Sequence, residues 1–185
     1  GTMLALSDGG TLRAARVLVA TGRAPRTRDL GLERIGLEPG SWLEVDDTMR
    51  VAGFDWLYAA GDVNRRALLT HQGKYQARIA GDAIATRAAG REVSDGAWGR
   101  HSATADHRVV PRVTFTDPEV ASVGLTAAGA ERAGLRTRVI DYDLSWLAGA
   151  TTHADDYRGR ARAVIDEDRR VVVGATFVGP DVAEL

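Results

Sequence analysis

The stretch "YAAGDVNRRALLTHQGKYQARIAGDAI", residues 58–84, decides how the rest of this 185-residue sequence is interpreted. Small residues at 59–61 let a ligand approach the backbone closely, and ligands of α/β folds bind at the carboxyl ends of strands. The carboxylate of Asp62 only accepts hydrogen bonds, so it suits a ligand rich in hydroxyls, such as a sugar or ribitol chain. The alternative is that Asp62 caps the following turn or pairs with Arg65 or Arg66.

A helix is predicted next, over residues 70–89, with Gly90 as its C-terminal stop. The first N–H groups of a helix lack internal partners and carry about half a positive charge. Such an end stabilises an anion by about 0.3–1 kcal/mol when exposed and by up to about 2 kcal/mol when partly buried. A reduced flavin carries its negative charge on the pyrimidine edge, so this helix start is suited to it. The alternative is that Thr70 simply caps a surface helix.

The segments before this stretch are typical of an α/β domain. Residues 4–6 and 12–20 form two strand-like runs, and residues 17–20 are apolar on both faces, as in a buried strand of a helix-covered sheet. Residues 26–45 are expected to be an irregular connection with one short helical turn. Residues 56–60 are expected to be another short buried strand.

The segments after it predict a different fold class. Residues 90–106 are rich in Gly, Ser and Asp and lack periodicity, so we place a domain boundary there and divide the chain into residues 1–106 and 107–185. Strands interrupted by one helix, capped by Thr126 and ending near Ala133, predict an α+β domain with an antiparallel sheet. The expected strands are residues 109–116, 120–123, 136–143, 161–165 and 171–178.

Both ends of the sequence are expected to be truncated. At the C-terminal end, Asp181 is a candidate helix cap, with Val182 and Leu185 on one face, and one turn of helix does not stabilise itself. At the N-terminal end, a buried strand of the parallel type appears with no βαβ unit before it. The alternative is a frayed natural terminus at each end.

Composition excludes several classes of function. A formal net charge of −1 gives no electrostatic reason to expect nucleic acid or an anionic membrane as partner. No apolar run approaches the roughly 18 residues that span a bilayer. The sequence has no cysteine, which excludes disulfide, thiolate and cysteine–metal chemistry within it. With no recognisable export signal, the cytoplasm is the default expectation.

Four motifs follow one another in the order and spacing of one family: "VLVATGRAPRT" (17–27), "LYAAGDV" (57–63), "ALLTHQG" (67–73) and "PRVTFTDPEVASVGLT" (111–126). They resemble the class I pyridine nucleotide–disulfide oxidoreductases, which include glutathione reductase, dihydrolipoamide dehydrogenase and mercuric reductase. The resemblance covers nearly the whole chain, from the last strands of the NAD(P)-binding domain through part of the FAD-binding domain into the dimerisation domain. A flavodoxin-like domain is disfavoured because it leaves "TFTDPEVASVGLT" unexplained.

The resemblance implies roles for individual residues. Gly22 looks like the glycine that approaches the nicotinamide dinucleotide. Asp62, behind Gly61, looks like the acid that binds the ribityl chain of FAD. The stretch that would lie along the flavin, with backbone N–H groups toward its pyrimidine edge, is Leu68, Leu69, Thr70 and His71. The segment from Pro111 onward resembles the start of the dimerisation domain, which implies a homodimer.

Three elements of the family are missing from the sequence. It contains no G-x-G-x-x-G, no C-x-x-x-x-C and no His-Pro pair. His153 lies in a polar stretch that we expect to be a solvated loop. We therefore expect no catalytic residue in this chain and no activity from it alone. The expected function is part of an FAD-dependent enzyme that passes hydride from NAD(P)H to FAD and on to a disulfide or another acceptor. The alternative is a stand-alone dimerisation or interaction module without cofactor.

Overall fold

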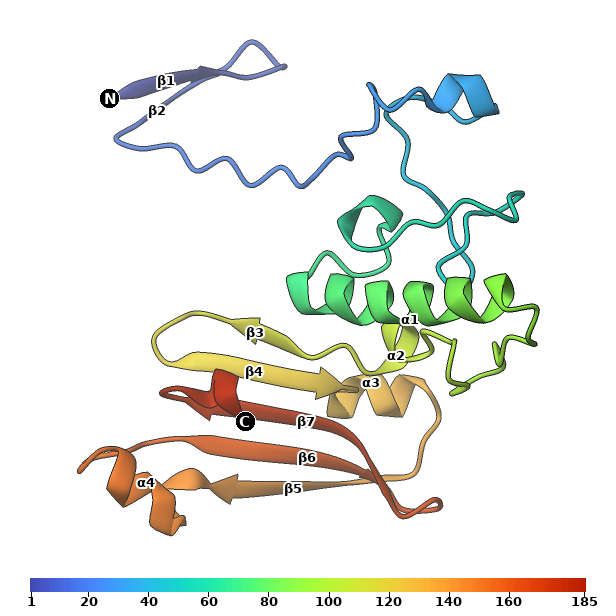
Figure 1. The fold of residues 1–185 in the computed structure, drawn as a ribbon. Coiled ribbons are helices and arrows are strands. Elements are labelled where there is room, and N and C mark those ends of the chain that lie inside the picture. Colours follow the sequence, from blue (N-terminus) through green and yellow to red (C-terminus); the bar gives the residue numbers. More distant parts are fainter. The chain divides into compact units, whose positions relative to one another are not determined.

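The computed structural model describes all 185 residues, which form two compact units, Gly1–Trp42 and Leu43–Leu185 (Figure 1). The domain boundary predicted near residue 106 falls inside the second unit and stays a prediction. None of the helices combines the length and the hydropathy that a membrane span requires.

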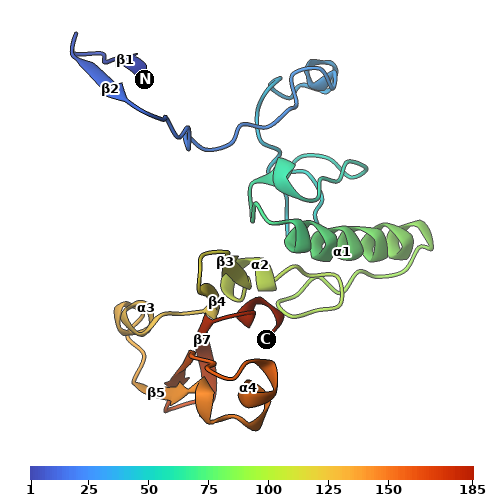
Figure 2. The same cartoon turned by 90° about the vertical axis from the view of Figure 1, so that its left-hand side faces the viewer.

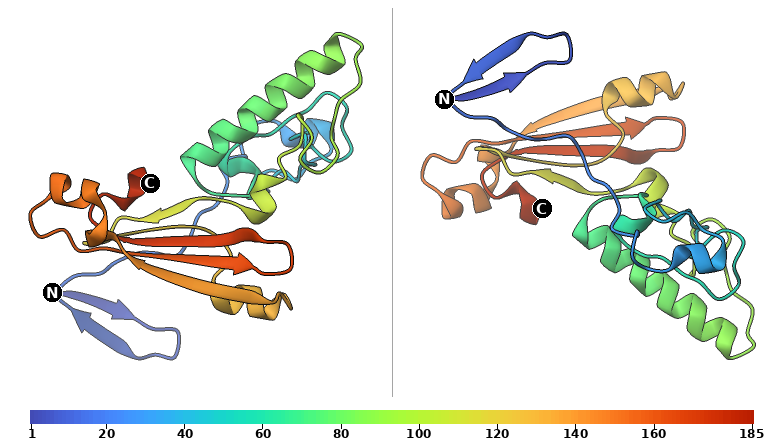
Figure 3. Two further views of the ribbon diagram at one scale, coloured as in Figure 1. Left: turned by 90° about the horizontal axis from the view of Figure 1, so that it is seen from below. Right: turned by 90° about the horizontal axis from the view of Figure 1, so that it is seen from above.

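The first unit contains a β-hairpin and one helical turn. Strands β1 (Thr2–Ala5) and β2 (Thr11–Ala14) pair antiparallel, with Thr2 opposite Ala14 (Figure 3). The turn between them is closed by Asp8, whose Oδ1 accepts a hydrogen bond from the Gly10 N–H at 2.8 Å. The turn expected within residues 26–45 is confirmed as the 3₁₀ helix η1 (Leu32–Ile35).

The prediction of a buried strand over residues 17–20 is wrong. Strand β2 ends at Ala14, and the apolar run that follows has no strand structure, with Leu18 90% exposed and Val19 76% exposed. A strand needs a hydrogen-bonded neighbour on at least one edge, and β1 pairs with β2 only up to that residue. The apolar run therefore lacks the partner strand that would bury it.

The long helix of the second unit is confirmed as α1 (Thr70–Ala88), which is uninterrupted in Figure 2. It stops where predicted, because Gly90 takes a left-handed conformation (φ 66°) and its N–H donates to the Arg87 carbonyl at 2.9 Å.

The prediction of a strand over residues 56–60 is wrong. This segment forms one isolated bridge, between Tyr58 and Arg50, and Trp56 is 61% exposed.

Helix α1 packs on the small core of the second unit with a face that is partly polar. Its buried residues are Gln72, Gln76, Ala80 and Ala83, which lie along one side of the helix. The core cluster consists of Met49, Ala80 and Ala103, with Val45, Tyr58, Tyr75 and Ile79 packed against it. Half of the buried helix face is therefore polar and has to be satisfied by hydrogen bonds.

The C-terminal part is a five-stranded sheet, antiparallel throughout, in the order β3-β4-β7-β6-β5 (Figure 1). Its strands are β3 (Arg112–Thr114), β4 (Glu119–Gly124), β5 (Thr137–Asp143), β6 (Arg160–Asp166) and β7 (Val171–Gly179). The predicted α+β class with an antiparallel sheet is confirmed. Short helices α2 (Ala105–Arg108), α3 (Ala127–Arg132) and α4 (Ala148–His153) accompany the sheet. The predicted cap of α3 is present, since the Thr126 hydroxyl accepts from the Gly129 N–H at 3.1 Å.

The end of the chain differs from its prediction. Residues after Asp181 form the three-residue 3₁₀ turn η4 (Val182–Glu184), and the Asp181 side chain does not cap it. Asp181 has φ 54°, and its carboxylate instead lies 2.9 Å from the His153 ring, at the end of α4. Val182 is buried whereas Leu185 is exposed, so they do not share a packed face. His153, expected in a solvated loop, is thus the last residue of a helix and paired with an acid.

Strands β4 and β7 approach each other unusually closely at two facing glycines. Gly124 lies opposite Gly174 in the register. A Cβ on Gly174 would lie 1.8 Å from the Leu125 carbonyl oxygen, and a Cβ on Gly124 would lie 2.3 Å from the Val173 carbonyl oxygen. Real side chains do not tolerate such distances, so both positions require glycine.

Replacing Gly174 with Ala should therefore lower the free energy of unfolding by about 1–3 kcal/mol, because the two backbones must separate. The matched control is Gly81→Ala in α1, where a Cβ would meet no atom within 4 Å. That change should stabilise by about 0.5–1 kcal/mol, because Ala favours a helix interior. Urea unfolding of both variants checks this, and equal shifts in the same direction would contradict the close approach.

Candidate functional site

The loop that carries Asp62 has a backbone conformation reserved for glycine. Gly61 has φ 84° and ψ −157°, a region that residues with a side chain essentially avoid. It leads into the 3₁₀ turn η2 (Asp62–Asn64), which ends at Arg65 in the left-handed region. The Asp62 side chain is exposed on this turn. The motif's glycine is thus required by the backbone that presents the acid.

The same loop lies against the first turns of α1. A Cβ on Gly73, the fourth residue of the helix, would lie 3.3 Å from the Gly61 Cα. This distance is tighter than ordinary van der Waals contact, so two glycines allow backbone to pack on backbone. The contact brings the Asp62 turn close to the N-terminus of α1, as the two parts of the motif predicted.

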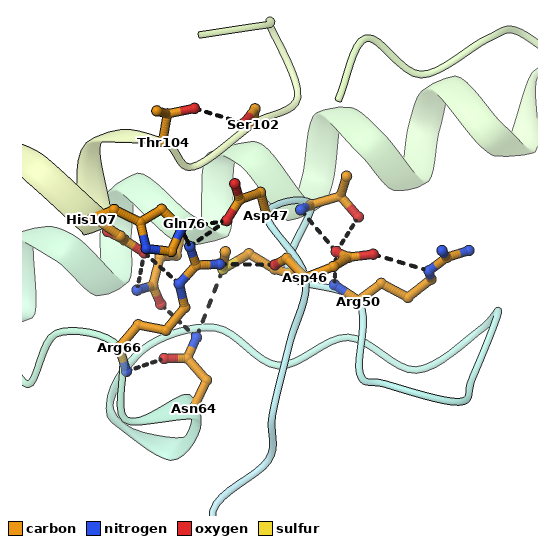
Figure 4. Close-up of polar contacts among 12 residues, drawn as sticks. Asp46, Asp47, Arg50, Asn64, Arg66, Gln76, Ser102, Thr104 and His107 are labelled. Atoms are coloured by element: carbon orange, nitrogen blue, oxygen red, sulfur yellow. Dashed lines mark hydrogen bonds and ion pairs between the residues drawn. The ribbon is translucent and has the colours of Figure 1, made fainter. Parts of the chain in front are cut away.

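A buried glutamine joins the loop to the helix. The Gln76 Oε1 accepts hydrogen bonds from the Gly61 N–H at 2.7 Å and from the Asn64 Nδ2 at 2.8 Å. Asn64 also donates to the Ala59 carbonyl at 3.1 Å. Figure 4 shows Asn64, Gln76 and Arg66 converging from the loop and the helix. These bonds fix the loop on both sides of Asp62.

The carboxylate of Asp106 closes the network from the other side. Its side chain is fully buried and accepts from Gln76 Nε2 at 2.8 Å and from Gln72 Nε2 at 2.9 Å. The guanidinium Nε of Arg66 lies 3.4 Å from the same carboxylate. A buried charge is stable only when it is paired and hydrogen-bonded, and here both oxygens have partners.

Arg66 also binds Asp47, at the edge of the network. The Asp47 carboxylate accepts from Arg66 and, at 2.7 Å, from His107 Nε2. Burial by itself raises the pKa of Asp47, but the hydrogen bonds and positive charges of His107 and Arg66 outweigh it. The pKa therefore lies below its ordinary value, and the ionised form is favoured in the folded protein.

The N-terminus of α1 has no internal cap. Its N-cap residue, Leu69, is extended (φ −135°, ψ 134°) and no side chain bonds the first N–H groups. The first turn contains no acid. The alternative in which Thr70 caps the helix is therefore wrong: Thr70 is the first helical residue. The first turn of this 19-residue helix therefore contributes no acid of its own to the positive helix end.

His71 uses its ring in a contact that the sequence did not predict. Its Nε2 lies 2.9 Å from the Pro111 carbonyl oxygen, just before β3. Because a carbonyl only accepts, Nε2 must carry the proton. The ring therefore links the start of α1 to the residue before β3. This bond uses the side chain of His71 and does not involve its backbone N–H.

Six of the seven predicted site residues lie in the second unit. The Asp62 loop and the helix start, residues 68–71, adjoin there. Leu68 and Leu69 are half-buried, whereas Thr70 and His71 are exposed. Gly22 lies in the first unit, with φ 102° and no atom within 4 Å of where a Cβ would stand. Their roles toward a cofactor stay predictions.

Sequence reasoning missed the residues that hold the site, chiefly Gln76, Asp106 and Arg66. Polar residues on a helix are usually solvated, so residue type alone predicts that Gln72 and Gln76 are exposed. Their spacing could have indicated burial, since both continue the row of Ala80 and Ala83 at helical spacing. Asp106, far away in the sequence, could not be assigned to this row without the fold.

Comparison with known proteins identifies the family. The family model described as pyridine nucleotide-disulphide oxidoreductase matches residues 2–80. The model of the dimerisation domain of the same family matches residues 110–185. The chain belongs to the pyridine nucleotide–disulphide oxidoreductases. The resemblance seen in the sequence motifs is thereby confirmed.

Curated relatives of this chain include several proteins named dihydrolipoyl dehydrogenase. The chain is 37% identical over 178 residues to the enzyme of Haloferax volcanii, covering 94% of this chain and 34% of the relative. It is 29% identical over 177 residues to that of Geobacillus stearothermophilus, covering 95% of this chain and 34% of the relative. The chain thus spans about a third of the length of the curated relatives it matches.

Solved structures of the family have the same fold over this region. LpdA from Mycobacterium tuberculosis superposes with a TM-score of 0.75 at 29% identity, covering 98% of this chain and 37% of that one. The HOCl-induced flavoprotein disulfide reductase RclA from Escherichia coli superposes with a TM-score of 0.71 at 25% identity, covering 97% and 38%.

The lowered pKa of Asp47 predicts an acid-dependent loss of stability. A carboxyl whose pKa is lowered by folding stabilises the protein above its unfolded pKa, about 4, and this contribution disappears as pH falls through the folded value. Asp47→Asn should therefore be less stable than the wild type at pH 7, and the difference should shrink below about pH 4. Urea unfolding at several pH values measures it, with the exposed Asp95→Asn as control. A difference that is constant with pH would contradict the pairing.

Proposed function

We propose that this chain forms part of the flavin site and the dimer interface of an FAD-dependent oxidoreductase. In that enzyme, hydride passes from NAD(P)H to FAD and on to a disulfide or another acceptor. The observation that carries the proposal is the uncapped, acid-free N-terminus of α1 beside the glycine-only turn that presents Asp62. Membership of the family and its flavoprotein relative support it.

The donors and acceptors present here fit FAD. The carboxylate of Asp62 can accept from the ribityl hydroxyls, which donate. The N–H groups of Thr70 and His71, at the positive end of α1, can donate to the carbonyl and nitrogen of the pyrimidine edge. Half-buried Leu68 and Leu69 offer apolar surface for the ring system. FAD, when bound, supplies reversible two-electron chemistry between the hydride donor and the acceptor.

The helix N-terminus would also favour the reduced form of the bound group. Reduction places negative charge on the pyrimidine edge, and the partial positive charge of α1 stabilises an anion by up to about 2 kcal/mol in a partly buried setting. An acid in the first turn would cancel this effect, and α1 has none there. The residues of this chain thus bind and tune the cofactor electrostatically.

Two further roles belong to the same proposal. Gly22 is proposed to approach the nicotinamide dinucleotide, and the open space where its Cβ would stand is compatible with a close backbone contact. Residues 107–185 are proposed as the dimerisation domain of a homodimer, which the family model over 110–185 supports. The sequence contains no cysteine, so any redox disulfide must come from outside this stretch.

Asp62→Ala should weaken the binding of FAD about tenfold or more, because a hydrogen bond to a charged group is lost. The measurement is a titration of flavin fluorescence with the product of the complete reading frame. The control is Asp95→Ala, which removes the same charge from an exposed loop. A variant that retains flavin as tightly as the wild type would remove Asp62 from the site. Absence of flavin from the wild type would favour the alternative of an interaction module without cofactor.

The product of the complete reading frame should be a homodimer. Light scattering coupled to size exclusion should give twice the mass of one chain, with no dependence on loading concentration in the micromolar range. A monomeric mass throughout that range would contradict the proposed interface.

A further inference from the structure

Gln76 is a fully buried polar side chain that joins helix α1 to the loop of the proposed flavin site. It is 0% exposed and makes three hydrogen bonds of 2.7–2.8 Å. Two of them reach the Asp62 loop, at the Gly61 N–H and the Asn64 amide. The third reaches the Asp106 carboxylate.

The orientation of this amide is dictated by its neighbours. A backbone N–H only donates and a carboxylate only accepts, so Oε1 must face Gly61 and Nε2 must face Asp106. The opposite orientation would set donor against donor and acceptor against acceptor. Asp106 is itself held by Gln72 and Arg66, so the amide has one satisfied arrangement.

The fixed orientation of Gln76 restrains Gly61, the residue before Asp62. Gly61 is the residue type with the most conformational freedom, and it adopts a backbone that few other residues can. Its N–H bond to Gln76 selects one conformation from that freedom and so sets the direction in which the chain enters the Asp62 turn. Without the bond, Gly61 would sample several conformations, and each ligand-binding event would have to order it again.

We propose that Gln76, oriented by Asp106, is a positioning residue that presets the Asp62 turn for its ligand. The inference rests on the proposed role of Asp62 in FAD binding. Gln76 touches no reacting atom. It acts through Gly61, and its contribution is preorganisation of the turn.

Gln76→Met tests this, because Met has a similar volume and cannot donate or accept in the same way. The matched control is Gln72→Met, on the same buried helix face and also bonded to Asp106, but without a bond to Gly61. With the product of the complete reading frame, Gln76→Met should raise the FAD dissociation constant about tenfold relative to Gln72→Met. In the flavin-free protein, the Gly61 amide should exchange with deuterium faster in Gln76→Met than in either the wild type or Gln72→Met.

The outcomes are distinguishable. Equal FAD affinity of Gln76→Met and Gln72→Met, or equal exchange at Gly61, would overturn the inference while leaving the proposed function intact. A wild type that binds no flavin would overturn both. If Met prevents folding, Gln76→Glu replaces it: beside Asp106 and Arg66, a protonated Glu can again donate to Asp106, so its FAD affinity should rise as pH falls. An FAD affinity of Gln76→Glu that does not change with pH would contradict the positioning role of residue 76.

Discussion

The buried carboxylate of Asp106 is the constraint on which this arrangement depends. An unpaired ion in a protein interior costs several kcal/mol, so the fold is stable only if donors reach it. The donors are Arg66, from the loop after Asp62, and Gln72 and Gln76, from α1. Satisfying one charge therefore draws three segments together, and the loop and helix meet where the ligand is proposed to bind.

The site that results is built largely from backbone. Gly61 and Gly73 let loop and helix touch, and an extended Leu69 leaves the first N–H groups of α1 uncapped. Such features need small residues at the contact and no acid in the first turn of α1. The one side chain proposed to contact the ligand through a charge, Asp62, is exposed on a turn that the network holds.

Helix α1 and the antiparallel sheet could be predicted because their signals are local: helical spacing with a glycine stop, and short apolar runs with turns between them. The apolar run at 17–20 misled because a strand also requires a neighbour, which local sequence does not encode. The partnership of Gln76 with Asp106 could not be predicted for a related reason. Helical spacing places Gln76 on the buried face of α1, but its partner lies 30 residues away in the sequence and is identified only from the fold.

The central claim is that Asp62 and the start of α1 hold one ligand between them. A crystal structure of the product of the complete reading frame with FAD tests it most directly. The account predicts a ribityl hydroxyl within hydrogen-bond distance of the Asp62 carboxylate, and the pyrimidine edge facing the N–H groups of Thr70 and His71. A flavin bound elsewhere, or an Asp62 turned away to pair with Arg65, would contradict it.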